Sequence, residues 1–165
     1  MSDPADPKVL LRALLLAEWN ESNHAGPRPD VRTGWRDENL QGPLVTVGPD
    51  DSTPTSDTGF DGFAPDGSGP TSTLRGTVDL NAWATRDVVD ENPKGAVDAW
   101  TREARRILRE WGHRLDEHPE LDADGYRYLS WFGRAYMPEQ PDDPEAVLEH
   151  RYRASVRFET HDDRQ

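Results

Sequence analysis

The chain has 165 residues, of which 32 are acidic and 19 are basic, and two of the basic residues, Lys8 and Lys94, are lysines. A net charge of −13 at pH 7 argues against a nucleic-acid groove, because such a groove needs a basic stripe. The chain has no cysteine, which excludes disulfides and cysteine-ligated zinc. The longest apolar stretch, residues 13–17, is far shorter than the roughly 20 residues that cross a bilayer, and no secretion signal is recognisable.

The balance of charged residues is typical of proteins that work in concentrated salt. The other 17 basic residues are arginines, and aspartate outnumbers glutamate by 20 to 12. In molar salt the Debye length falls to about 3 Å, so repulsion within such a surface is screened while its carboxylates stay hydrated. We therefore expect a protein of an extreme halophile, or of a virus that infects one. An ordinary acidic protein from a GC-rich genome is the alternative.

The chain is long enough for one domain, but its core is lean. Its length lies within the roughly 100–200 residues that are usual for a single domain. Hydrophobic residues make up 33% of the chain, although six tryptophans add large apolar surfaces. We expect a single domain over residues 1–165 whose packing benefits from oligomerisation.

The N-terminal half predicts a helix, two short strands and a long loop. Residues 7–19 are almost wholly apolar, and Asp6 followed by proline supplies a helix cap and first turn. Such a helix is buried on most of its circumference or lies between subunits. Residues 31–35 and 43–47 are interpreted as short strands. Residues 48–72 are rich in Gly, Pro, Ser, Thr and Asp without periodicity, which predicts a long projecting loop.

The strongest strand and helix signals follow this loop. Residues 73–85 alternate apolar and polar side chains, as in a strand with one buried face, and the polar side also carries Trp83. Residues 93–111 carry apolar side chains at spacings of three and four, which predicts an amphipathic helix. Asn92 is the expected cap, and Gly112 stands where a left-handed residue ends a helix.

The C-terminal part predicts two further strands. Residues 126–137 are interpreted as a strand, although their aromatic content makes this segment ambiguous. Residues 148–159 alternate strictly, and at about 3.3 Å per residue they extend some 40 Å. Together the elements predict an α+β fold, in which a mostly antiparallel sheet of about four strands packs with two main helices and carries a long loop.

Two aspartate motifs in the loop lack the context that their chemistry requires. Asp57 with the Thr and Gly that follow it matches the tripeptide of aspartic proteases, but it has no flanking apolar strands. Asp57, Asp61 and Asp66 could offer oxygen ligands, but they do not follow the spacing of a calcium-binding loop. For both aspartate motifs, a flexible polar loop without a specific site is the simpler interpretation.

The histidines do not form a recognisable metal motif either. His113, Glu117 and His118 have one residue too many for an inverted zinc-protease motif. His150 lies on the apolar side of the last predicted strand, where a hydrogen-bonded core or interface histidine is expected. We therefore expect no catalytic residue, no cofactor-binding residue and no metal ligand.

Two groups of residues are candidates for contact with other proteins. Phe60 and Phe63 are the aromatic residues of the long loop. Arg151, Arg153 and Arg157 alternate along the last strand and form a basic row on an acidic protein. This row is either a solvated face that balances local charge or a docking edge for an acidic neighbour.

The order of these elements resembles that of the tail-terminator or tail-completion proteins of long-tailed, siphovirus-like viruses. In that family an apolar helix is followed by short strands with an excursion loop and by a strand that ends near a tryptophan. A helix like the one starting at Asn92-Pro93 and a closing pair of strands complete the order. The resemblance covers most of the chain and rests on element order and pattern, and the loop at residues 48–72 is longer than in the shortest members.

The resemblance implies a structural virion protein without enzymatic activity. Its subunit would be a small α+β sandwich, and six copies would form a ring in the neck of the tail. The ring would cap the tail tube and join it to the head–tail connector, after assembly in the host cytoplasm. The implied partners are further copies of the chain, the tail tube protein and the connector protein, with no membrane and no sequence-specific nucleic acid. Together with the composition, this indicates a virus of haloarchaea.

Three alternatives remain open at this point. A different head–tail connector or minor tail protein would have another symmetry, which the mass of the oligomer in high salt reveals. A non-viral haloarchaeal partner-binding module would be encoded away from capsid and tail genes. A hydrolase that uses acid or metal chemistry would lose activity when Asp57 or His113 is replaced.

Overall fold

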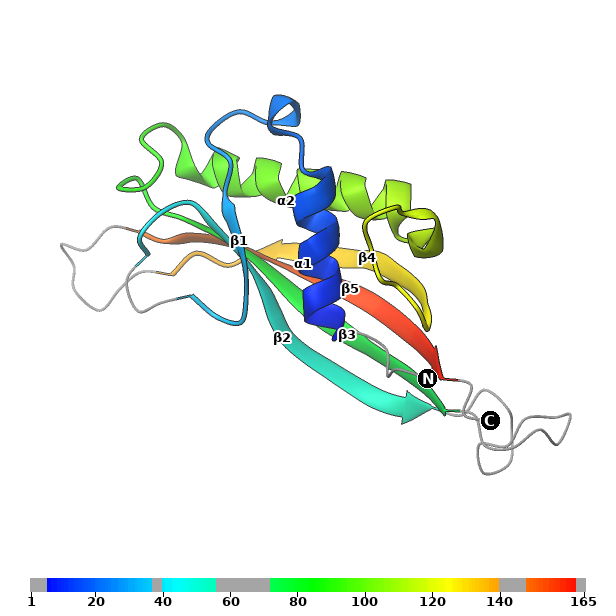
Figure 1. Cartoon of the computed structure of the whole chain (residues 1–165). Coiled ribbons are helices and arrows are strands. Elements are labelled where there is room, and N and C mark those ends of the chain that lie inside the picture. Colours follow the sequence, from blue (N-terminus) through cyan, green and yellow to red (C-terminus); the bar gives the residue numbers. More distant parts are fainter. Residues whose placement is uncertain (1–5, 37–39, 56–71, 140–147, 163–165) are drawn as a thin grey trace, which may run out of the picture.

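The computed structural model of the protein describes residues 6–36, 40–55, 72–139 and 148–162. Over these residues the chain forms two α-helices and one five-stranded sheet (Figure 1). The predicted α+β class is confirmed, although the sheet has five strands where about four were expected. The elements are α1 (Pro7–Glu18), β1 (Asp30–Thr33), β2 (Leu44–Thr55), β3 (Ser72–Ala84), α2 (Pro93–Trp111), β4 (Tyr126–Tyr136) and β5 (His150–Asp162), with short 3₁₀ turns η1 (Glu21–Asn23) and η3 (Leu115–Glu117).

The sheet has the strand order β1-β2-β3-β5-β4, with β3 at its centre beside β5. β1 runs parallel to β2, and all other neighbours are antiparallel. The 13 residues of β3 pair with the 13 residues of β5 without a register shift. Because these strands lie far apart in the chain, their pairing joins the N-terminal and C-terminal parts in one sheet.

Both helices lie on one face of the sheet, and the core fills the space between them and the strands (Figure 1). α1 packs over β1 and β2, while α2 packs over β3, β5 and β4. The strands contribute alternate side chains to this core, among them Val78 and Leu80 of β3. Ala154, Val156 and Phe158 of β5 are also buried, which confirms the predicted inward side of the last strand.

α1 forms where the sequence predicted it, but it buries only one side. Asp6 caps its first turn by accepting a hydrogen bond of 2.9 Å from the backbone N–H of Lys8. On the outer side, Val9 and Leu16 are 56% and 37% exposed. The expectation of burial around most of the circumference is therefore wrong, and the alternative that α1 lies between subunits stays a prediction. The buried residues all lie on the side toward the sheet: Leu10, Leu11, Leu14 and Leu15.

α2 has the bounds that its periodicity predicted. A side-chain cap fixes its start, and the close approach of β4 determines which residue can follow its end. The Asn92 side chain caps the start by accepting a hydrogen bond of 3.1 Å from the N–H of Gly95. At the other end the prediction of a left-handed glycine was wrong, since Gly112 has a φ of −59°. Glycine is required there because a Cβ would collide with the carbonyl oxygen of Leu129 in β4.

The prediction of a loop over residues 48–72 was wrong for its first part, which belongs to β2. Residues 48–55 continue this strand, and after a bulge at residues 48–49 the strand pairs with β3 again from Asp50 to Thr55. Gly48 has a φ of 131°, and a Cβ there would press on the side chain of Lys8 in α1. β3 then begins at Ser72, and residues 56–71 lie outside the described residues.

We predict that Leu14→Ala lowers the free energy of unfolding by about 2–5 kcal/mol, because this fully buried side chain would leave a cavity beneath α1. Leu16→Ala, on the exposed side of the same helix, should change it by about 0.5 kcal/mol or less. Denaturant unfolding in molar KCl measures the difference. Equal losses from the two substitutions would contradict the one-sided burial of α1.

Candidate functional site

The sheet face opposite the helices, called the open face below, is the candidate functional site. Figure 1 shows both helices on the other side of the sheet. The register of β3 and β5 places side chains of both central strands on the open face in facing pairs. In pairing order, these are Arg75, Thr77, Asp79, Asn81 and Trp83 of β3 with Glu159, Arg157, Ser155, Arg153 and Arg151 of β5.

Two irregularities in β4 add side chains to the open face. The register of β4 against β5 shifts twice, with Arg127 and Phe132 as the extra residues. Arg127 donates a hydrogen bond to Glu159, and the ring of Phe132 lies against Arg157. Sequence reasoning missed both residues, because strict alternation does not show where a bulge falls. Gly133 was the available signal for the second bulge, since a glycine inside a strand often marks one.

Two tryptophans and one arginine cover one end of the open face. Trp83 is fully buried edge-to-face with Trp35, their ring centroids 5.0 Å apart, and its indole N–H donates to the Thr46 hydroxyl at 3.0 Å. The Arg151 guanidinium lies 4.6 Å from the Trp83 ring and 4.9 Å from the Trp35 ring. It also donates to Asn81 Oδ1 at 2.9 Å. This cluster is a small second core on the open face.

A buried carboxyl group borders the tryptophan cluster. Glu149 is 8% exposed, and its Oε1 lies 3.0 Å from Nε of Arg36. Burial raises the pKa of Glu149, and the nearby Glu139 raises it further, whereas the charges of Arg36 and Arg151 lower it. The net effect is a raised pKa, so this carboxyl group holds its proton more readily than one on the surface.

A second polar cluster crosses three strands of the open face. Glu159 is 4% exposed and accepts hydrogen bonds from Arg75 of β3 at 2.7 Å and from Arg127 of β4 at 2.8 Å. The hydroxyl group of Tyr128 lies 3.4 Å from the same carboxylate. Because hydrogen bonds to a charged group are among the stronger ones, this carboxylate ties β3, β5 and β4 together through side chains.

The three predicted interface arginines have different surroundings on this face. Arg151 is 8% exposed and belongs to the tryptophan cluster. Arg153 is exposed and pairs with Asp79 at 2.9 Å. Arg157 is also exposed, and its guanidinium lies 3.7 Å from the ring centroid of Phe132. The structure thus brings a cation and an exposed aromatic ring together at the surface. Contact with a partner stays a prediction for all three arginines.

The other sequence motifs do not assemble into a reactive site in the described part of the chain. Phe60 and Phe63 of the predicted loop lie outside it, as do the aspartate motifs in residues 57–66. His118 is buried, and its Nε2 lies 2.8 Å from a carboxylate oxygen of Glu18. Within the described ranges, no three His, Asp or Glu side chains gather closely enough to hold a metal ion.

His150 makes the kind of contact that the sequence predicted. Its Nδ1 lies 2.6 Å from the hydroxyl oxygen of Tyr136, and the two rings are stacked. Burial lowers the pKa of His150, and the positive charge of Lys94 lowers it further. The prediction of a hydrogen-bonded histidine is therefore confirmed, and its ring favours the neutral form.

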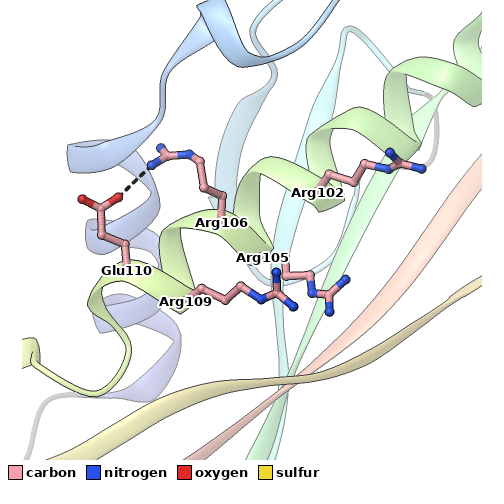
Figure 2. A pocket seen from close by; sticks show the side chains of 5 residues that line it. All are labelled: Arg102, Arg105, Arg106, Arg109 and Glu110. Atoms are coloured by element: carbon pink, nitrogen blue, oxygen red, sulfur yellow. Dashed lines mark hydrogen bonds and ion pairs between the residues drawn. The ribbon is translucent and has the colours of Figure 1, made fainter.

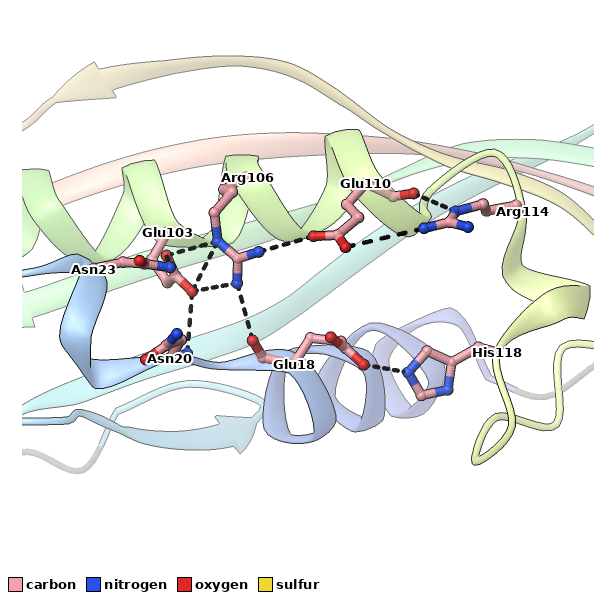
Figure 3. Close-up of polar contacts among 8 residues, drawn as sticks. All are labelled: Glu18, Asn20, Asn23, Glu103, Arg106, Glu110, Arg114 and His118. Carbon is pink, nitrogen blue, oxygen red and sulfur yellow. Dashed lines mark hydrogen bonds and ion pairs between the residues drawn. The ribbon is translucent and has the colours of Figure 1, made fainter.

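A buried carboxylate anchors the segment after α1 to α2 (Figure 3). Glu103 of α2 is 3% exposed. It accepts hydrogen bonds from the backbone N–H of Asn20 at 3.1 Å and from the side-chain amide of Asn23 at 3.0 Å. Arg106 donates to the same carboxylate at 2.6 Å and to the carbonyl oxygen of Glu18 at 3.0 Å. This network fixes the end of α1 against α2, and sequence reasoning did not find it.

The ionisation of Glu103 gives the network a pH dependence. Burial alone would raise the pKa of Glu103, but hydrogen bonds from Arg106, Asn20 and Asn23 outweigh it and hold the pKa below the ordinary value of 4.5. The carboxylate therefore stabilises the fold fully above that ordinary pKa. Its contribution is lost as the pH falls through the lowered pKa of the folded state.

We predict that Glu103→Gln lowers the free energy of unfolding at neutral pH by about 1–3 kcal/mol, because a buried, hydrogen-bonded charge is lost. The difference from the wild type should shrink as the pH falls below the ordinary pKa of glutamate. Denaturant unfolding between about pH 3 and pH 7 measures it. Glu110→Gln, exposed on the same helix, is the control. A difference that stays constant over this range would count against the assigned role.

We also predict that Arg151→Lys lowers the free energy of unfolding by about 1–3 kcal/mol, because lysine cannot stack flat on two indole rings while it hydrogen-bonds to Asn81. Arg153→Lys, on the same strand and face but exposed, should change it by about 0.5 kcal/mol or less. Thermal and denaturant unfolding in high salt compare the two. Similar effects would show that burial of the Arg151 guanidinium contributes little.

The chain was compared with known protein families and with curated protein sequences. Neither the family models nor the curated protein sequences compared with the chain match it. In the described part of the chain, neither helix is long and apolar enough to cross a bilayer.

Proposed function

We propose that the protein is a structural subunit that assembles into a ring, caps the tail tube of a long-tailed virus of haloarchaea and joins the tail to the head connector. The observation that carries the proposal is the open face, where apolar side chains stay exposed beside arginines. The order of helices and strands supports the same function, since it is the order that the resemblance to tail-terminator proteins implied.

The open face has the composition of a protein interface. Trp35 and Phe132 are 54% and 60% exposed, and Met137, just after β4, is 38% exposed. Aromatic residues, methionine and arginine are the residue types enriched at interfaces, and exposed apolar side chains in one region commonly mark a contact site. Arg157 against Phe132 adds a cation over an aromatic ring. A neighbouring subunit would cover these side chains and exclude water from them.

The sheet edges offer a second means of association. β4 forms one edge of the sheet. At the other side, β1 pairs only with residues 44–47 of β2, so the later part of β2 has β3 as its one described neighbour. A strand from another chain can add to such an edge through main-chain hydrogen bonds. Contacts of this kind between unlike surfaces of identical copies can close into a ring.

The charge of the chain fits assembly in a salt-rich cell. In molar salt, exposed charges more than about 3 Å apart are largely screened, so acidic copies can pack side by side despite their net charge. The partners of the ring are further copies of the chain, the tail tube protein and the head–tail connector protein. Capping a tube requires binding and no covalent reaction.

The purified protein in molar KCl should form a ring of six copies, detected by native mass spectrometry and electron microscopy. Mixed with the tail tube protein of the same genome, the ring should stop tube elongation. A complex of three or twelve copies would instead favour a minor tail protein or a different connector. A stable monomer that does not bind the tube would contradict the proposal.

We predict that Phe132→Asp weakens ring assembly, because it replaces an exposed aromatic ring of the open face with a charged side chain. Val9→Asp, at a similarly exposed apolar site on α1, is the comparison and should leave assembly unchanged. Sedimentation velocity over a range of concentrations measures both. Loss of assembly in the α1 variant alone would place the subunit contact on the helices and not on the open face.

A further inference from the structure

The outer side of α2 carries a concentration of positive charge that stands out on a chain with a net charge of −13. A shallow hollow of about 540 Å³ lies along this helix (Figure 2). Its lining includes one carboxylate, Glu110, and four arginines within two turns of the helix. These arginines form the arginine surface: Arg102, Arg105, Arg106 and Arg109.

Two members of the arginine surface are neutralised within the chain, and two are not. Arg102 and Arg106 form ion pairs with carboxylates of the same helix. Arg105 and Arg109 are exposed and make no hydrogen bond or ion pair with a described residue. Figure 2 shows their side chains extending away from the pair that Arg106 forms with Glu110.

This arrangement is unfavourable for an isolated chain. Arg105 and Arg109 are four residues apart on one helix, and like charges at this spacing repel each other. Arg109 lies in the last turn, where the negative end of the helix dipole favours a cation. Arg105 lies one turn earlier, so the dipole does not account for it. A local rule broken without compensation in the described part of the chain is expected at a functional site.

Unpaired carboxylates are concentrated in the segment that follows α2. Residues 116–124 carry four exposed acidic side chains that form no ion pair with any residue in the described part of the chain, namely Asp116, Glu120, Asp122 and Asp124. The turn before α2, residues 86–91, has fewer acidic side chains and also carries the cation of Arg86. Residues 116–124, called the acidic segment below, are therefore the stronger complement to the arginine surface.

We propose that the arginine surface docks the acidic segment of a second copy of the chain. The two surfaces lie at different places on one molecule, so each copy can bind one neighbour through its arginines and another through its carboxylates. A head-to-tail contact of this kind closes into a ring when the rotation between neighbouring copies returns to the first copy. Guanidinium groups hold carboxylates through paired hydrogen bonds, and pairs buried at an interface are screened by salt less than exposed pairs. The inference rests on the proposed ring and assigns one of its contacts.

Charge reversal tests this contact. Arg105→Glu/Arg109→Glu makes both docking surfaces acidic, and Asp122→Arg/Asp124→Arg removes two of the five carboxylates of the acidic segment and adds two cations there. Each variant alone should need roughly tenfold or more protein to reach half-assembly. An equimolar mixture should assemble like the wild type, because each kind of chain then meets its complement in the other. Native mass spectrometry and sedimentation velocity in KCl measure assembly and show whether the two kinds of chain alternate.

Arg28→Glu/Arg32→Glu is the matched control, since it changes the net charge equally at exposed sites outside the arginine surface and the acidic segment and should assemble like the wild type. If the wild type forms rings and Arg105→Glu/Arg109→Glu does so equally well, the inference is overturned while the ring stands. A mixture that stays dissociated overturns it as well, and a wild type that stays monomeric overturns both proposals. Unfolding curves check that each variant folds. If Arg105→Glu/Arg109→Glu does not fold, Arg105→Gln/Arg109→Gln replaces it, with a smaller loss of assembly expected.

Discussion

The uninterrupted pairing of β3 with β5 is the constraint on which the rest of the structure depends. One register places Val78 opposite Val156 beneath α2 and Trp83 opposite Arg151 on the open face. A slip of one residue would exchange the two faces, exposing the valines and burying charged side chains. The same pairing therefore determines both the hydrophobic core and the surface that we assign to assembly. It also explains why a lean composition suffices, since the core needs apolar side chains on one face of the sheet only.

Elements with a strong local pattern could be predicted from the sequence, and those decided by distant neighbours could not. Both helices follow from apolar spacing and from the caps at Asp6 and Asn92. Residues 48–55 were interpreted as loop because of their Asp and Pro content, but β3 offers them a partner strand and overrides that preference. Gly112 was identified as a helix end for the wrong reason, because the approach of Leu129 from β4 cannot be seen in local sequence.

The candidate site shows the same division between local and distant information. The alternation of Arg151, Arg153 and Arg157 placed them on one face of a strand, as the register of β5 shows. Their different environments could not be predicted, because Trp35 reaches the open face from the segment after β1 and buries Arg151. Phe132 was missed because a bulge places it there. Its exposure beside Arg157 is a product of the folded sheet and not of any sequence motif.

The two bulges of β4 also have a consequence for the selectivity of that edge. They interrupt the regular spacing of the backbone N–H and C=O groups along the edge. A straight strand therefore cannot form main-chain hydrogen bonds with β4 over its full length. Runaway stacking of free subunits into fibrils is thereby disfavoured at high concentration. A segment with matching kinks can still align with the edge. The irregular edge thus resists pairing with straight extended peptides in a crowded cell.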